Sequence, residues 1–445
     1  MTADVTLNAS DTTHGGAGPA PDALRPAPHH GRRASLFVLF TVLLDSIGIG
    51  IMLPALPKLI ESFTPGDAVL AALMVGGFGA VWGLAQLFGS PFLGALSDRY
   101  GRRPVILISN LGLGLDYLLM AFAPTLWLLV VGRIIAGFTA ATFATAYAYV
   151  TDVTPEAERA GAYGRIGAVF GLGFIMGPAI GGVLAEFGPR VPFILAAVLS
   201  LVNFIYGYFV LPESLARENR MPFAWRRANP FASLKLLRRS SRLAWLSVVS
   251  LLDQLALVSI PVTFVLYTSH TFQWDGMTTG LTFTAIGVGL AIVQGVLMGP
   301  VVARLGNRRT LLLGLAFAIV GFLMYGLAPS SWVIWAAIPL LTLWGLVEGP
   351  NQTLMSREVT ASEYGQLQGA LAALLGIAET VGPLIFSQLY AYAIGPAASW
   401  APPGAPFLFA AALHVIAIAI AAWILRNEPW LPQPATAEAT GRADG

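Results

Sequence analysis

The sequence predicts an all-α integral membrane protein whose twelve transmembrane helices form two pseudo-symmetric six-helix bundles, with both termini in the cytoplasm. Three observations support this fold class. Apolar residues make up 56% of the 445-residue chain, charged residues only 11%, and the mean hydropathy is +0.72, whereas a water-soluble chain carries about a quarter charged residues. Apolar runs of membrane-spanning length recur along nearly the whole chain. A long polar segment separates six runs from six, and the two halves resemble each other.

Each apolar run is long enough to cross a hydrocarbon core about 30 Å thick as a helix. The runs are expected at 35–61, 69–96, 104–123, 125–151, 159–186, 191–211, 243–268, 277–303, 309–328, 332–357, 364–393 and 405–426. The domain organisation that follows is a disordered cytoplasmic tail at 1–34, an N-terminal bundle at 35–211, a cytoplasmic linker at 212–242, a C-terminal bundle at 243–426 and a second tail at 427–445. The first tail has no apolar core, so it is not expected to be a secretory signal peptide.

The positive charges predict the orientation in the membrane. Of the 25 lysines and arginines, only Lys58 and Arg190 fall in loops on one side, and most of the others cluster in the tails and alternate loops. The side with the basic loops is expected to be cytoplasmic. Lys58 and Lys235 are the only lysines, and so strong an excess of arginine is typical of a GC-rich bacterium. The protein is therefore expected to be a multi-pass protein of a bacterial inner membrane. The chain has no cysteine, so no disulfide or thiol chemistry is available to it.

Sequence motifs of the first half are repeated in the second half, at an offset of about 205 residues. The second expected span ends in 94-GALSDRYGRRP-104 and the eighth in 299-GPVVARLGNRR-309, while the first contains 43-LLDSIGIGIMLP-54 and the seventh 251-LLDQLALVSIP-261. Repeated halves of this kind are a transporter architecture, in which the substrate binds near the midplane between them.

Five acids lie well inside expected spans, and each is costly in hydrocarbon. They are Asp45, Asp116, Asp253, Glu348 and Glu379. Asp45 comes roughly ten residues into the first run, about 15 Å along a helix and so near the membrane midplane. A carboxyl group in an apolar environment becomes a reversible proton carrier, because burial disfavours its charged form. The alternative for each acid is a structural role, paired, hydrogen-bonded or at the wet end of a span.

The segment 94–104 has the chemistry of a cytoplasmic gate. Its glycines allow a sharp turn, and Asp98 can cap the positive end of a neighbouring helix. Arg102 and Arg103 face water and anionic lipid, and Arg99 is assigned to the same gate. The segment resembles the cytoplasmic signature of the major facilitator superfamily. The resemblance implies that the neighbouring helix is the eleventh span, starting near Gly365, and that Asp152 pairs with Arg102 or Arg103.

Three further motifs are similar to those of the drug/proton antiporters in that superfamily. The first span carries Asp45, Gly48, Pro54 and Pro57 in their pattern, and 133-RIIAGFTAA-141 resembles their membrane-embedded arginine motif. The segment 173-GFIMGPAIGG-182 resembles their glycine-proline motif, in which small residues let two helices approach closely. The residues assigned to this motif are Gly173, Gly177, Pro178, Gly181 and Gly182.

Within this branch the chain most resembles the bacterial tetracycline/proton antiporters, over nearly all of 35–426. Phrases that carry the resemblance are 96-LSDRYGRRPVIL-107, 112-GLGLDYLLMAFAPTLW-127, 192-PFILAAVLSLVNF-204 and 366-QLQGALAAL-374. The chain departs from that group in the ninth span, where Ala318 stands at the position of an acid that takes part in proton coupling. We expect Asp253 to replace that acid, with Glu379 as the second candidate.

Other polar and aromatic positions inside spans complete the expected pathway. Arg133 is expected to modulate the proton affinity of a nearby acid, Asp45 or Asp116. Candidates for the substrate cavity are Gln86, Asn110, Asn203, Gln254, Gln294, Trp82, Phe170, Phe174, Tyr206 and Trp344. The polar members could equally be hydrogen-bonded between helices, and His414 is expected to be structural.

The motifs leave one main hypothesis and one alternative. No nucleotide-binding loop, metal-ligand cluster or nucleophilic triad is recognisable, and the GxG runs lie inside apolar spans. We therefore expect no enzyme, no metal and no cofactor, with the proton as the coupling ion. The main hypothesis is a proton-coupled antiporter that exports a lipophilic drug, tetracycline-like or broader. The alternative is a metabolite transporter, exporter or proton symporter, on the same fold. The expected partners are the drug, protons and membrane lipid, not nucleic acid, and the protein is expected to be a monomer.

Overall fold

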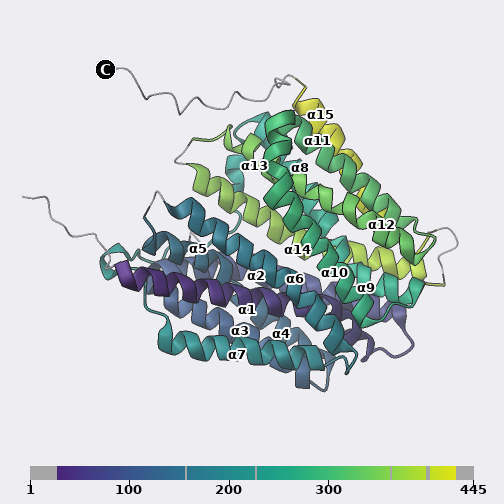
Figure 1. The fold of residues 1–445 in the computed structure, drawn as a ribbon, viewed down its shortest axis with the longest axis horizontal. Helices are drawn as coiled ribbons and strands as arrows, with labels where there is room; N and C mark the ends of the chain where they lie inside the picture. The colour runs from purple at the N-terminus through teal and green to yellow at the C-terminus, as the bar shows by residue number, and fades with distance from the viewer. Residues whose placement is uncertain (1–27, 156–157, 226–227, 361–362, 397–400, 427–445) are drawn as a thin grey trace, which may run out of the picture.

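The computed structural model describes residues 28–155, 158–225, 228–360, 363–396 and 401–426, and these residues fold into two helical halves. The helices of the N-terminal half are α1 (Pro28–Glu61), α2 (Ala68–Tyr100), α3 (Arg102–Phe122), α4 (Leu126–Thr139), α5 (Thr142–Val153), α6 (Arg159–Ala185) and α7 (Val191–Val210). The helices of the C-terminal half are α8 (Ser241–Leu257), α9 (Ser259–Phe272), α10 (Gly276–Ile292), α11 (Met298–Gly326), α12 (Ser331–Thr342), α13 (Glu348–Ser356), α14 (Tyr364–Ile394) and α15 (Ala405–Ile424). Figure 1 shows the first half below and the second half above, with helices running lengthwise through both.

The described helices are long enough for the twelve membrane crossings that the sequence predicts. Eleven segments of the described chain are long and apolar enough to span a bilayer. One of them, 276–326, has 51 residues, or about 75 Å of helix at ~1.5 Å per residue, which is enough to cross twice. Its helix is broken at Gly306, where the backbone is not helical. Three other crossings consist of two shorter helices each, namely α4 with α5, α8 with α9, and α12 with α13.

The structure corrects two of the expected boundaries. Helix α1 begins at Pro28, so the last part of the expected tail at 1–34 is helical and the rest of it lies outside the described residues. The linker at 212–242 is not wholly irregular, because it contains short helical turns at Arg217–Asn219 and Ser233–Arg238, and α8 already begins at Ser241. The expected tail at 427–445 lies outside the described residues.

The internal repeat is visible in the backbone of two turns. Gly101, between α2 and α3, has φ 112°, and Gly306, within α11, has φ 74°. With ψ 167° and 165° as well, both turns lie in a region that is essentially restricted to glycine and that costs other residues about 1–3 kcal/mol. The two turns are separated by the same offset as the sequence repeat, so the chain turns at a glycine at the equivalent place in each half.

The apolar core is shared by the halves at one end of the molecule and divided at the other. The largest buried cluster joins Ile51 and Phe78 of the first half to Phe264 and Phe386 of the second. Two smaller clusters lie where the helices begin and end beside the basic loops, one built from residues 37–211 and the other from residues 236–425. The halves are therefore packed together at the end opposite the basic loops, here called the outer end.

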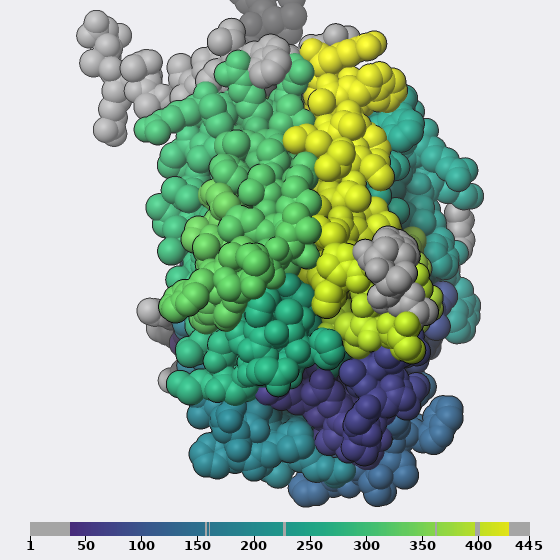
Figure 2. Space-filling model, turned by 90° about the vertical axis from the view of Figure 1, so that its right-hand side faces the viewer, coloured from purple at the N-terminus to yellow at the C-terminus, as the bar shows by residue number. Residues whose placement is uncertain are grey.

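Close packing of small residues closes the outer end. A Cβ atom on Gly182 of α6 would lie 2.5 Å from the carbonyl oxygen of Gly276 at the start of α10, and one on Gly76 of α2 would lie 1.9 Å from Ser387 Oγ of α14. Figure 2 looks at this end and shows atoms of the N-terminal and C-terminal halves in contact across it. The outer end is therefore closed and the core is divided at the end beside the basic loops. With the basic loops in the cytoplasm, as the sequence predicts, this is an inward-facing conformation.

Candidate functional site

A buried ion pair lies in the N-terminal half. Asp116 of α3 pairs with Arg133 of α4, whose Nε also donates to Asp116 Oδ1 at 3.3 Å. The Asp116 side chain is 0% exposed and that of Arg133 is 3% exposed, and Nη1 of Arg133 contacts Met52 Sδ at 2.9 Å. Of the two acids expected near Arg133, the structure therefore places Asp116 against it.

Asp45 is buried in a polar cluster formed by α1 and α7. Its Oδ1 accepts a hydrogen bond from Asn203 Nδ2 at 3.4 Å, and Asn203 Oδ1 accepts one from Thr41 at 3.1 Å. The second oxygen, Oδ2, is buried and has no hydrogen bond within 3.5 Å among the described residues, although the Thr142 hydroxyl of α5 lies close to this carboxyl group. Both polar side-chain atoms of Asn110 on α3 are likewise buried without a partner among the described residues. This acid lies inside its own half rather than at the surface between the halves, with one oxygen available to a proton.

Asp253 of α8 is the centre of a cluster that joins three elements of the C-terminal half. Its Oδ1 accepts from Trp344 Nε1 at 2.5 Å, and it lies 3.2 Å from His414 Nε2 of α15. The other ring nitrogen, Nδ1, lies 2.9 Å from the carbonyl oxygen of Ala410. The sequence did not reveal this use of His414, because nothing in an isolated histidine indicates a partner 161 residues away.

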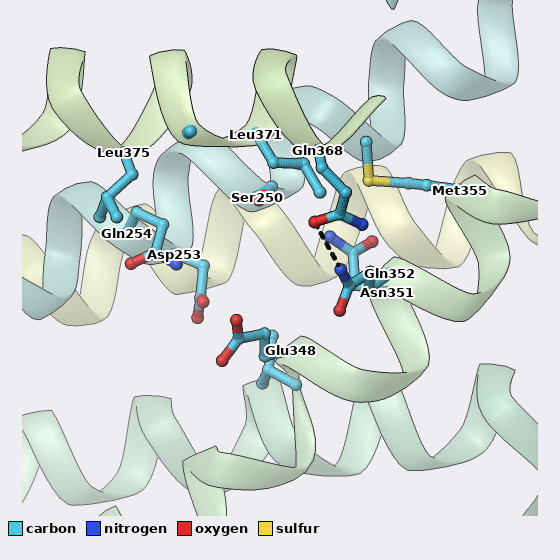
Figure 3. Close-up of a pocket in the computed structure, with 12 residues that line it drawn as sticks. Ser250, Asp253, Gln254, Glu348, Asn351, Gln352, Met355, Gln368, Leu371 and Leu375 are labelled. Atoms are coloured by element: carbon cyan, nitrogen blue, oxygen red, sulfur yellow. Dashed lines mark hydrogen bonds between the residues drawn. The ribbon is translucent and has the colours of Figure 1, made fainter. Parts of the chain in front are cut away.

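A polar pocket of about 230 Å³ opens beside this cluster. Figure 3 shows the carboxyl groups of Asp253 and Glu348 pointing toward each other, with Gln254 beside Asp253. On the other side Gln352 Nε2 donates to Gln368 Oε1 at 3.1 Å. Glu348, at the start of α13, has an exposed side chain, although the residues just before it in the sequence are buried. The pocket therefore offers two acids and several amide groups to a polar or cationic ligand.

Glu379 connects the two halves instead of lining that pocket. Gln86 Nε2 of α2 donates to Glu379 Oε2 of α14 at 3.1 Å. A Cβ atom on Gly83, one turn before Gln86, would lie 2.3 Å from the carbonyl oxygen of Glu379, so the helices touch at this level. Separating the halves here would break this hydrogen bond.

The aromatic and polar cavity candidates are dispersed. Phe170 and Phe174 stack on each other with ring centroids 5.8 Å apart, and Phe170 also contacts Phe143. Tyr206 packs on Phe37 of α1. Trp82 is partly buried against the shared core and Gln294 is exposed on a π-helical turn at Val293–Leu297. These residues do not gather at one site, whereas Trp344 and Gln254 do border the Asp253 cluster and its pocket.

The cytoplasmic motif forms a charge network within the N-terminal half. Arg102 Nη1 contacts Asp98 Oδ1 at 2.6 Å and its Nε donates to Asp152 Oδ2 at 3.1 Å. Arg103 donates to the carbonyl oxygen of Tyr208 at 2.6 Å, and Arg99 lies over the ring of Tyr100. The expected pairing of Asp152 is thus with Arg102.

In this conformation none of the hydrogen bonds and ion pairs described for Asp98 involves the eleventh span, a contact that the motif predicts for the outward-facing state. Its carboxylate pairs with Arg102, and its backbone carbonyl accepts from Met221 N of the linker at 3.0 Å. The physical reason is the divided core, because α2 and α14 pack together nearer the outer end. The gate is therefore open in the inward-facing state.

Aromatic residues of the linker occupy the face of α2 near the gate. Phe92 lies against Phe223 and Trp225 with ring centroids 5.7 and 6.1 Å away, and Phe88 contacts Phe231 at 6.1 Å. The sequence indicated only a polar linker here, because its charges outnumber its few aromatic residues. The linker thus packs against α2 rather than crossing free solvent.

The glycine-proline motif brings α6 against α1. A Cβ atom on Gly177 would lie 2.6 Å from the Cα of Gly50, and one on Gly181 would lie 2.5 Å from the carbonyl oxygen of Ile51. Gly173 faces Ser46 in the same way, at 2.5 Å. Pro178 lies inside α6 and next to Gly50. The last glycine of the motif, Gly182, faces the other half, so the motif serves both packing within one half and closure of the outer end.

Carboxylates also connect the halves at the outer end. Glu186, which ends α6, accepts through Oε1 from the backbone N–H groups of Gly276 at 2.9 Å and Met277 at 3.2 Å. Asp275 caps the same end of α10. Hydrogen bonds from the Thr278 side chain and backbone lower the pKa of Asp275, and the positive charge of Lys58 from the other half lowers it further. The N-terminus of α10 is therefore held from both halves.

The chain matches the family model described as Major Facilitator Superfamily over residues 38–383 and 246–444. It is 36% identical to the tetracycline resistance protein, class C, of Escherichia coli, over 86% of this chain and 95% of that protein. The chain belongs to the major facilitator superfamily. It is also 36% identical to the class G tetracycline resistance protein of Vibrio anguillarum, over 83% of this chain and 93% of that protein. Both relatives are named for tetracycline resistance, and the similarity covers more than four fifths of this chain.

Solved structures agree on the fold. The human organic anion transporter MFSD10 (TETRAN) aligns with a TM-score of 0.64 at 23% identity, covering 89% of this chain and 100% of that one. The nucleoside transporter NupG aligns with a TM-score of 0.72 at 13% identity, covering 89% of this chain and 99% of that one. At these identities the likeness concerns the fold alone.

Proposed function

We propose that the protein exports a lipophilic, tetracycline-like drug across a bacterial inner membrane in exchange for protons, by alternating access. The observation that carries the proposal is the similarity to proteins named for tetracycline resistance, which extends over more than four fifths of the chain and both halves. Both halves of the transporter come from one chain, which supports action as a monomer.

The geometry supports this proposal at three points. The outer end is closed by Gly182 and Glu186 against the start of α10, while the pocket beside Asp253 belongs to the cytoplasmic half of the molecule. The drug would enter from the cytoplasm in this state. Buried carboxylates in both halves, Asp45 and Asp253, supply groups that can exchange a proton.

The proposal predicts that transport is driven by a proton gradient. Purified protein in proteoliposomes should accumulate tetracycline when the lumen is acidic, by exchange of lumenal protons for external drug, and collapsing the gradient with a protonophore should abolish accumulation. Vesicles without the protein are the control for passive entry of the drug. Drug accumulation that persists without a pH gradient and depends on ATP would contradict the mechanism. Gradient-dependent transport of a metabolite, with none of tetracycline, would favour the alternative function.

A further inference from the structure

The two ring nitrogens of His414 have different partners, and this difference determines where its proton lies. Nδ1 is 2.9 Å from the carbonyl oxygen of Ala410, one turn earlier in α15. A carbonyl oxygen only accepts hydrogen bonds, so Nδ1 must carry a hydrogen and donate it. The neutral ring has one N–H group. In the neutral form, therefore, Nε2 carries a lone pair.

That lone pair would face a second acceptor. Nε2 lies 3.2 Å from Asp253 Oδ1, and both side chains are buried, 1% exposed for His414 and 4% for Asp253. A lone pair and a carboxylate oxygen at this distance repel each other unless a proton lies between them. The contact is therefore unfavourable between an ionised Asp253 and a neutral His414. It becomes favourable when one additional proton is bound between the two side chains.

Trp344 decides on which side of the contact the proton lies. Its indole N–H, which can only donate, is 2.5 Å from the same oxygen, Asp253 Oδ1. That oxygen therefore serves as an acceptor from Trp344 and is best suited to accept a second hydrogen from His414. The ring of His414 also stacks on Phe322 of α11, with centroids 5.3 Å apart, which fixes its plane.

We infer that His414 and Asp253 form one proton-binding site, in which the proton lies on His414 Nε2 and the pair is an imidazolium–carboxylate. The inference rests on the proposed proton-coupled function and adds His414 to it as the residue that holds the transported proton.

The pocket provides the route by which the pair gives up its proton. The carboxyl group of Glu348 points at that of Asp253 from the pocket side. Among the described residues, the other groups that face the pair are uncharged: Gln254 of α8, Trp344 before α13 and Phe322 of α11. A cationic group of a ligand in the pocket would take over the role of the imidazolium charge, because it would stabilise the carboxylates of Asp253 and Glu348. The proton would then leave His414 through Glu348 to the cytoplasm as the ligand binds, which is the exchange that an antiporter needs.

The protonation state can be measured without transport. The chain has five histidines, so the ¹⁵N ring signals of the purified, detergent-solubilised protein can be assigned by single substitutions such as His414→Gln. At neutral pH the signals of His414 should show a hydrogen on both nitrogens in the wild type. In Asp253→Asn they should show the neutral ring with its hydrogen on Nδ1. A neutral His414 ring in the wild type would overturn the inference.

The second measurement counts protons. Adding tetracycline to the solubilised wild-type protein in weak buffer should release protons, and the number released should fall by one in Asp253→Asn and in His414→Gln. The double variant should resemble each single variant, because the two residues act as a unit. It also leaves no unpaired charge, which makes it the variant to use if a single substitution does not fold. His270→Gln is the matched control, since His270 is exposed at the outer end.

The outcomes separate the inference from the proposed function. If tetracycline releases no proton from the wild type and is not transported, the proposed function fails, while the ring signals still decide whether the pair holds a proton. If the wild type releases protons and transports the drug, but both variants release as many as the wild type, the function stands and His414 and Asp253 are not the proton site. In that case uphill accumulation by His414→Gln should also match the wild type.

Discussion

Replacing Glu186 by glutamine should shift the protein from the inward-facing toward the outward-facing conformation. Glu186 accepts two backbone hydrogen bonds from the first residues of α10, at 2.9 and 3.2 Å, and these bonds must break when the outer end opens. A carboxylate at a helix N-terminus contributes about 0.3–1 kcal/mol when exposed, and Glu186 is exposed. Glutamine keeps an acceptor but loses the charge.

The expected size of the shift follows from these numbers. A loss of about 0.3–1 kcal/mol changes the ratio of the two conformations by a factor of roughly 1.7 to 5. Alanine, which also loses the acceptor, should cost about 1–2 kcal/mol, or roughly five- to thirtyfold. The change favours the outward-facing state because only the closed outer end contains these bonds.

The absence of cysteine from the chain makes the assay direct. Spin labels can be attached at Phe187→Cys and Trp332→Cys, whose native side chains are 75% and 81% exposed at the outer ends of the two halves. Pulsed electron–electron distance measurements then give the populations of the two conformations. Asp67→Asn is the matched control, because Asp67 caps α2 within its own half, accepting from Leu70 N at 2.8 Å. Equal populations in wild type and Glu186→Ala would refute the reasoning, as would a shift of the same size in Asp67→Asn.

Three further substitutions test the buried charges and the gate. Asp116→Asn should lower the unfolding free energy by about 3–5 kcal/mol, because it leaves Arg133 buried and unpaired. Denaturant unfolding should show this loss, and the double variant Asp116→Asn/Arg133→Gln should recover part of the lost unfolding free energy. Asp45→Asn should abolish gradient-driven drug accumulation while the thermal stability holds or rises, since it removes a buried charge; unchanged accumulation in proteoliposomes would exclude Asp45 from the proton pathway. Asp98→Asn should reduce turnover with normal amounts of folded protein in the membrane, because it weakens the gate; wild-type turnover would limit the motif to setting the topology.

The arrangement of the helices in two repeated halves could be predicted from the sequence because its signals are local. A run of apolar residues long enough to cross the bilayer identifies a span, whichever helices that span packs against. The repeated turns at Gly101 and Gly306 also leave a local signal, a glycine among basic residues. The start of α1 at Pro28 was missed because the helix continues beyond the apolar run, and hydropathy does not detect that part.

The contacts inside the site were harder to predict because they depend on how each helix is rotated about its axis. In a membrane the face toward lipid is as apolar as the face toward protein, so hydropathy does not say which side chains meet. Asp116 and Arg133 could be suspected of pairing as two opposite charges in neighbouring spans. The meeting of Asp253 with His414, and of Glu186 with the start of α10, depends on tertiary packing alone.

The two repeated turns have a consequence for how the transport cycle is controlled. Their shapes match, but the acid and arginine that hold the first turn, Asp98 and Arg102, correspond to Ala303 and Asn307 in the second. Arg308 there donates instead to the carbonyl oxygen of Arg426, at the end of the described chain. The two turns thus share a backbone shape but differ in the side chains that hold them. In the first half Asp98 and Arg102 form the cytoplasmic gate, whereas in the second half Arg308 holds the end of the last helix. Substitutions at equivalent places in the two halves should therefore have unequal effects on the cycle.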